Sequence, residues 1–133
     1  MPTVVLGYVP KPEGEAALAA SIAEARLRQA DLVVVNSHRG GREYDDATSN
    51  RTEQDLSALE TKLEDSGLTY EVRPLVRGLE PAEDLIGIAE DIGAELIVIG
   101  LRRRTPVGKL ILGSNAQRIL LDAPCPVLAV KVG

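Results

Sequence analysis

Five short apolar runs constrain the fold of this chain more than any other feature. Each is rich in Val, Ile and Leu and carries little charge, which is typical of strands buried on both faces of a parallel sheet. The runs cover residues 4–9, 32–35, 70–76, 96–99 and 127–132. Stretches with a helical spacing of apolar residues lie between them. This strict alternation predicts an α/β domain with a doubly wound, five-stranded parallel sheet, right-handed crossovers and helices on both faces.

Residues in the expected helices support this organisation. Leu56, Leu59 and Leu63 form one apolar stripe before the third strand. Gly67 and Gly93 stand where a helix commonly ends in a left-handed residue. We therefore expect the helices that precede the third and fourth strands to end at these two glycines.

The expected order of the strands places a ligand site. Pro74 removes a hydrogen-bond donor from the third strand, so that strand should lie at an edge of the sheet. In open parallel sheets, ligands bind beyond the carboxyl ends of the strands, where the strand order reverses. With the order 3-2-1-4-5, the reversal lies between the loops of residues 9–14 and 100–113. We expect the whole chain, residues 1–133, to form one domain of this kind.

The second of these loops belongs to a positively charged island in an acidic chain of net charge −5. Between Glu95 and Asp122 there is no acidic residue, whereas there are five basic ones: Arg102, Arg103, Arg104, Lys109 and Arg118. The island leads into a helix whose start, Gly113-Ser114, offers free backbone amides and the positive end of the helix dipole. This combination predicts a phosphate site. Ser114 and Gln117 also have the spacing of a capping box, so the alternative is that Ser114 only caps its helix.

The composition excludes several classes of partner. Proteins that bind nucleic acids neutralise phosphates with Lys and Arg, and this chain has a net negative charge. It has three Tyr and neither Trp nor Phe, so few rings are present to stack on bases or on a flavin. No apolar run approaches the ~20 residues of a membrane span. The lack of a secretory signal after Met1 and the single cysteine, Cys125, favour a cytoplasmic location.

Residues that often carry catalysis are isolated in this sequence. His38 begins a polar segment, residues 38–50, that we interpret as a loop, and no Asp or Cys is placed in sequence to orient or use it. Cys125 lies between two prolines without a nearby base, so we interpret it as a packing residue. The pair Asp45-Asp46 supplies too few oxygen ligands for a metal ion. We therefore predict no catalytic residue and no metal site formed by the protein alone.

One segment resembles a known family. Residues 100–130 end in Gly-Ser-Asn-Ala-Gln-Arg-Ile-Leu-Leu-Asp-Ala-Pro-Cys-Pro-Val-Leu-Ala-Val, which is similar to the C-terminal signature of the universal stress protein family. The order of strands and helices is also similar, which implies a flavodoxin-like fold of the adenine nucleotide alpha hydrolase type. Nucleotide-binding members carry the motif G-x2-G-x9-G-[ST], which holds the phosphates and ribose of ATP. Gly100, Gly113 and Ser114 match this motif at the required separation.

The chain departs from the family pattern at two positions. Arg103 replaces the middle glycine of the motif, where its side chain either occupies the phosphate space or grips a phosphate. Val9 stands where nucleotide-binding relatives carry an Asp that contacts the adenosine, and the loss of such a charged hydrogen bond costs about 10- to 100-fold in affinity. The resemblance implies that the residues in contact with ATP or AMP are Gly100, Arg103, Gly113, Ser114 and Asn115.

Two functions follow from the resemblance. In the first, the chain is a stress-response binding or regulatory module that acts through bound ATP or AMP, with at most a slow ATPase activity. In the second, it binds no nucleotide and recognises a protein or an anion through its arginine-rich loop. A phosphoacceptor signalling domain of flavodoxin-like topology is disfavoured, because it needs carboxylates where Val9-Pro10 and Val76-Arg77 stand.

The last strand predicts the oligomeric state. Residues 127–132 are largely apolar and would form the second edge of the sheet. An exposed apolar edge tends to pair with another strand. Pairing with the same strand of a second copy would give an isologous contact, so we expect a homodimer with two-fold symmetry, as is common in the family that the chain resembles.

Overall fold

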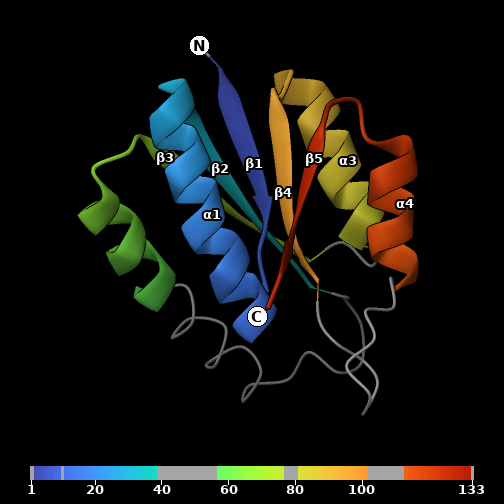
Figure 1. Cartoon of the computed structure of the whole chain (residues 1–133), viewed down its shortest axis with the longest axis horizontal. Helices are drawn as coiled ribbons and strands as arrows, with labels where there is room; N and C mark the ends of the chain where they lie inside the picture. Colours follow the sequence, from blue (N-terminus) through green and yellow to red (C-terminus); the bar gives the residue numbers. More distant parts are fainter. Residues whose placement is uncertain (1, 10, 39–56, 77–80, 102–112, 133) are drawn as a thin grey trace.

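The computed structural model describes residues 2–9, 11–38, 57–76, 81–101 and 113–132. Its strands form a single parallel sheet in the order β3-β2-β1-β4-β5. They are β1 (Thr3–Gly7), β2 (Asp31–His38), β3 (Tyr70–Val76), β4 (Leu96–Leu101) and β5 (Val127–Lys131). The predicted fold class and strand order are therefore confirmed (Figure 1).

The two edges of the sheet are β3 and β5. The prediction from Pro74 is confirmed, because β3 is an edge strand in which Pro74 stands opposite Asn36 of β2. One sequence interpretation was wrong. His38 was assigned to a loop but is the last residue of β2, because the parallel pairing with β3 continues as far as Val76. The rest of the predicted loop, residues 39–50, lies outside the described residues.

In the described part of the chain, four helical segments occur, and they cover both faces of the sheet (Figure 1). Three of them are α1 (Pro12–Arg28), α3 (Pro81–Ile92) and α4 (Ser114–Asp122). The fourth covers residues 57–66 and lies between β2 and β3 in the chain. The helix over residues 57–66 and α1 pack on one face, and α3 and α4 pack on the other.

The central strand β1 separates two apolar clusters. Val4 and Leu6 point to the side of α1, whereas Val5 points to the side of α3, and all three are fully buried. This follows from the two-residue repeat of a strand, which directs successive side chains to opposite faces. Burial on both faces explains why the strands appear in the sequence as nearly continuous apolar runs.

The helix ends follow the expected backbone geometry. Gly67 and Gly93 have φ angles of 76° and 64°, which confirms the prediction that helices end there in a left-handed residue. After α1 the same conformation is adopted by Gln29, with φ of 52°. The sequence offered no signal at Gln29, because a residue with a Cβ rarely adopts this conformation. Within the described residues, no helix is long and apolar enough to cross a membrane.

Candidate functional site

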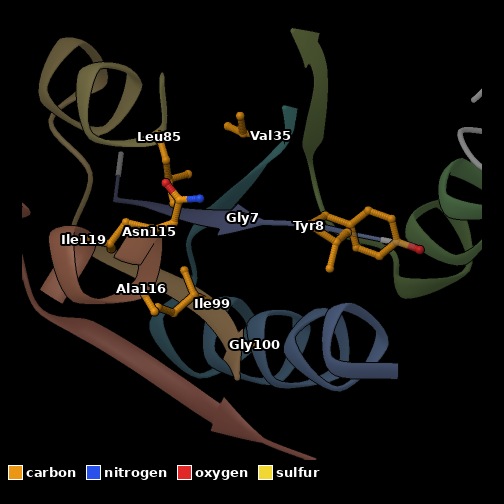
Figure 2. Close-up of a pocket in the computed structure, with 10 residues that line it drawn as sticks. Gly7, Tyr8, Val35, Leu85, Ile99, Gly100, Asn115, Ala116 and Ile119 are labelled. Carbon is orange, nitrogen blue, oxygen red and sulfur yellow. The ribbon is translucent and has the colours of Figure 1, made fainter. Parts of the chain in front are cut away.

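A cavity of about 210 Å³ opens at the carboxyl ends of β1 and β4, beside the first turn of α4 (Figure 2). This is the point where the strand order reverses, so the described structure places a cavity where the sequence predicted one. The residues that line the cavity are Gly7, Tyr8, Val9, Val35, Leu85, Ile99, Gly100, Asn115, Ala116 and Ile119.

The inner surface of the cavity is apolar. Gly7 lies at its base, and a Cβ added there would stand 3.0 Å from Cδ2 of Leu85 and 3.5 Å from Cγ2 of Ile99. Leu85 and Ile99 are both nearly fully buried. A glycine at this position thus makes room for the two apolar side chains that form the base of the cavity. This surface is suited to the apolar faces of a ring rather than to a phosphate.

Tyr8 contributes to the cavity without presenting its hydroxyl group to it. Figure 2 shows the ring turned away from the other lining residues. The hydroxyl donates a hydrogen bond to Oε1 of Glu15 at 2.6 Å, and Nζ of Lys62 donates to Oε2 of the same carboxylate at 2.6 Å. Burial acts to raise the pKa of Glu15, but the hydrogen bonds from Lys62 and Tyr8 lower this pKa below its ordinary value. Glu15 therefore stays ionised and joins the end of β1 to α1 and to the helix over residues 57–66.

The start of α4 differs from the sequence interpretation. Gly113, not Ser114, is the N-cap residue, and as a glycine it makes no side-chain cap hydrogen bond. The backbone N–H of Gln117 donates to the carbonyl oxygen of Gly113 at 3.0 Å, so Ser114 is already the first helical residue. The predicted capping box is therefore wrong. The first turn also carries no acidic residue, and the amides and positive dipole end of a helix N-terminus favour an anion.

The structure brings together only part of the predicted site. Gly100 and Asn115 line the cavity, while Gly113 and Ser114 lie at the adjoining start of α4 and are not among the lining residues. Arg103 lies outside the described residues, as do the other basic residues of the loop over residues 102–112. Val9, where the resemblance implied a missing carboxylate, does line the cavity and has an exposed fraction of 38%.

Arg118 has a different role from the one that the charge pattern suggested. It was counted with the positive island, but its Nη1 atom lies 2.8 Å from Oε1 of Glu83 in α3. Its Nε atom lies 3.7 Å from Oδ2 of Asp122. The pair with Glu83 joins α4 to α3, whereas the pair with Asp122 lies within α4, and at the surface each contributes at most about 1 kcal/mol. Because Arg118 pairs with these carboxylates, one basic residue fewer supports an anion site than the sequence count implied.

Two glycines near the cavity are required by contacts between backbones. A Cβ added to Gly100 would lie 2.1 Å from the carbonyl oxygen of Glu13. A Cβ added to Gly14 would lie 1.7 Å from the carbonyl oxygen of Val9. The first turn of α1 thus packs directly against the ends of β1 and β4. Sequence spacing alone did not reveal the contact between Gly100 and Glu13, because it joins segments that are far apart in the chain.

The remaining candidates show no catalytic arrangement within the described residues. Cys125 is half-buried against the cluster on the α3 side, and burial raises the pKa of its thiol, which keeps the thiol protonated and unreactive. No group of three or more His, Cys, Asp and Glu side chains that could hold a metal ion occurs in the described ranges. Asp45 and Asp46 lie outside those ranges.

Comparisons with known proteins agree with this architecture. The family model described as the universal stress protein family matches residues 1–131. A universal stress protein of Mycolicibacterium smegmatis is 45% identical over 128 residues, which cover 96% of each chain. The chain belongs to the universal stress protein family. The solved structure of a universal stress protein from Archaeoglobus fulgidus has a TM-score of 0.83 and 37% identity, over 98% of both chains.

A second solved universal stress protein bears on the cavity. It also comes from Archaeoglobus fulgidus and was solved in complex with dAMP. It is 32% identical to the present universal stress protein, with a TM-score of 0.76 over 98% of both chains. A relative of similar sequence and fold thus binds an adenine nucleotide.

Proposed function

We propose that this universal stress protein is a binding and regulatory module that holds an adenine nucleotide, ATP or AMP, in the cavity between the ends of β1 and β4. The observation that carries the proposal is the position of the apolar cavity beside the first turn of α4. The complex of the Archaeoglobus fulgidus relative with dAMP supports the same class of ligand. We further infer a cytoplasmic location, which the single cysteine supports.

The size of the cavity indicates that the base and the phosphates of a nucleotide bind at different places in the site. Sites for drug-sized ligands commonly have volumes of ~300–1,000 Å³, so a cavity of about 210 Å³ fits the base of a nucleotide but not the whole molecule. The phosphates would then lie at the mouth, against the backbone amides of α4. Binding or release of the nucleotide would alter the protein surface around the ends of β1 and β4. This surface is the one offered to a protein partner.

Substitution of Val9 by Asp tests the proposal. Val9 lines the cavity and is partly exposed, so the carboxylate can enter without being buried. If the cavity holds a nucleoside, a charged hydrogen-bond acceptor at this position should tighten the binding of AMP by about tenfold. Isothermal titration of the natural protein and of Val9→Asp measures the difference.

Leu27→Asp is the matched control, because it adds the same charge at a strongly exposed position at the far end of α1. Its affinity for AMP should equal that of the natural protein. The proposal fails if neither the natural protein nor Val9→Asp binds AMP or ATP at millimolar concentration.

A second candidate function is a module that binds no nucleotide. It is favoured by Val9, since no carboxylate occurs among the described residues that line the cavity. The two functions differ in what the purified protein carries. Mass spectrometry that finds AMP or ATP at nearly one molecule per chain excludes the second function.

The homodimer through β5 also remains a proposal. The strand lies at an edge of the sheet, and only its last residue, Lys131, is exposed like a typical surface residue. The unpaired side of such a strand offers backbone donors and acceptors to the same strand of a second copy. We expect analytical ultracentrifugation to give the mass of a dimer at micromolar concentration. A monomer that persists at millimolar concentration would rule out this interface.

A further inference from the structure

A second cavity, of about 360 Å³, lies at the opposite end of the sheet, where β1, β2 and β3 begin. Its volume is within the range of ~300–1,000 Å³ that is common for small-molecule sites. It is lined by residues at the beginnings of these three strands and by Ile92 at the end of α3. Neither the proposed nucleotide site nor the proposed dimer uses these residues.

Three residues with side-chain oxygens stand in one row at this cavity. Thr3 of β1 pairs with Asp31 of β2 in the register of the sheet. Thr69 lies on the other side of Asp31, because the residues that follow them, Leu32 and Tyr70, pair with each other. All three line the second cavity. A residue with a carboxylate is therefore flanked by two residues with hydroxyl groups, across neighbouring segments of the chain.

The carboxylate of Asp31 gives the second cavity its net charge. The other two charged lining residues neutralise each other, since Nε and Nη2 of Arg73 donate to the two carboxylate oxygens of Glu71 at 2.8 and 3.3 Å. The half-buried side chain of Asp31 makes no hydrogen bond or ion pair within the described part of the chain. A carboxylate that has lost part of its hydration without gaining a partner favours a cationic ligand.

The end of α3 adds to the preference for a cation. Ile92 is the last residue of this helix, and the last turn contains no basic residue. The negative end of the helix dipole is therefore not balanced by a side chain of that turn. Ile92 and the buried Val33 also give the second cavity an apolar surface. A matching ligand combines a positive charge with an apolar stem.

We propose that the second cavity binds the ammonium group of a primary alkyl amine and places the alkyl chain on Val33 and Ile92. A primary ammonium group has three donors and no acceptor. These donors match the carboxylate of Asp31 and the hydroxyl oxygens of Thr3 and Thr69. A free alkyl amine and the lysine side chain of another protein present this same chemistry. The proposal does not depend on a nucleotide in the first cavity.

Removal of the donors from the ligand tests the site. Pentylammonium and pentyltrimethylammonium carry the same charge and the same alkyl chain, but only the first donates hydrogen bonds. The natural protein should bind pentylammonium with a Kd of about millimolar, and the methylated ion at least about tenfold more weakly. Titration followed by heteronuclear NMR measures both affinities and should shift the amide signals of Thr3, Asp31 and Thr69. Equal affinities for the two cations, or shifts confined to other residues, would overturn the proposal.

Two variants and a control test the residues. Asp31→Asn keeps the shape of the side chain and removes its charge, so binding of pentylammonium should weaken by about 10- to 100-fold. Thr69→Val removes a hydroxyl group from an exposed residue and should weaken binding by about tenfold. Asp91→Asn is the matched control, because Asp91 is exposed beside Ile92 and does not line the second cavity. Its affinity should stay within about twofold of that of the natural protein.

The variants also exclude a non-specific attraction to acidic groups. The proposal is wrong if either lining variant, once shown to be folded, binds pentylammonium like the natural protein. It is equally wrong if Asp91→Asn loses as much affinity as Asp31→Asn does.

A third ligand distinguishes the two sources of the ammonium group. Nα-acetyl-lysine methylamide carries this group on a peptide unit. Tighter binding of this compound than of pentylammonium indicates the lysine side chain of a partner, and the reverse order indicates a free amine. Either result supports the ammonium site, whereas failure of both compounds to bind at high millimolar concentration overturns it.

Discussion

Gly14→Ala is expected to destabilise the protein by about 3 kcal/mol, at the upper end of what overpacking usually costs. The added Cβ would lie 1.7 Å from the carbonyl oxygen of Val9 and 2.7 Å from its carbonyl carbon. Both are backbone atoms, so no side chain can rotate away to relieve the clash. The first turn of α1 would have to move away from the end of β1.

Thermal unfolding measures this effect, and a chain of 133 residues should lose on the order of 10 °C in Tm. Gly87→Ala is the matched control. Gly87 lies within α3, and a Cβ added there meets nothing within 4 Å. The same substitution should therefore stabilise the protein by about 0.5–1 kcal/mol, because alanine favours a helix more than glycine does. An unchanged Tm for Gly14→Ala would show that α1 is not held against β1 in this way.

Gly100→Ala should be similarly destabilising, by about 3 kcal/mol, even when no nucleotide is present. Its Cβ would lie 2.1 Å from the carbonyl oxygen of Glu13 and 2.6 Å from the carbonyl carbon. Gly100 corresponds to the first glycine of the family motif, which the resemblance assigns to the ligand. The structure adds a packing requirement at the same position, because β4 and α1 approach one another through their backbones.

Urea unfolding of the nucleotide-free protein distinguishes the two roles of Gly100. A packing role lowers the midpoint of unfolding in the absence of ligand. If Gly100→Ala unfolds at the same urea concentration as the natural protein but no longer binds AMP, the glycine serves the ligand alone, and the contact with Glu13 is not a determinant of stability.

These two glycines connect stability with the site. Glu13 and Gly14 form the first turn of α1, which lies against the ends of both β1 and β4. Val9 and Gly100, on the other side of these contacts, line the cavity. A shift of α1 would therefore displace the walls of the cavity as well as weaken the fold, so variants in this turn should be judged for both properties.

Much of the architecture could be predicted from the sequence, because local patterns carry it. Apolar runs marked the strands, Pro74 marked the edge strand, and Gly67 and Gly93 marked two helix ends. The end of β2 was misjudged at His38, because its strand conformation depends on pairing with β3 rather than on its own polarity. The place of the cavity followed from the strand order alone.

The amino-acid sequence by itself determined the strands, their order, the family and the position of the cavity. Each of these depends on residue patterns that are short or that follow one another along the chain. Only the tertiary structure decided that Gly113 is the N-cap residue of α4, that Arg118 pairs with Glu83, and that Leu85 closes the base of the cavity. The contacts of Arg118 and Leu85 join segments that are distant in the chain. The cap depends on the path by which the chain enters α4. Such contacts are settled by how the elements pack, so no local pattern could specify them.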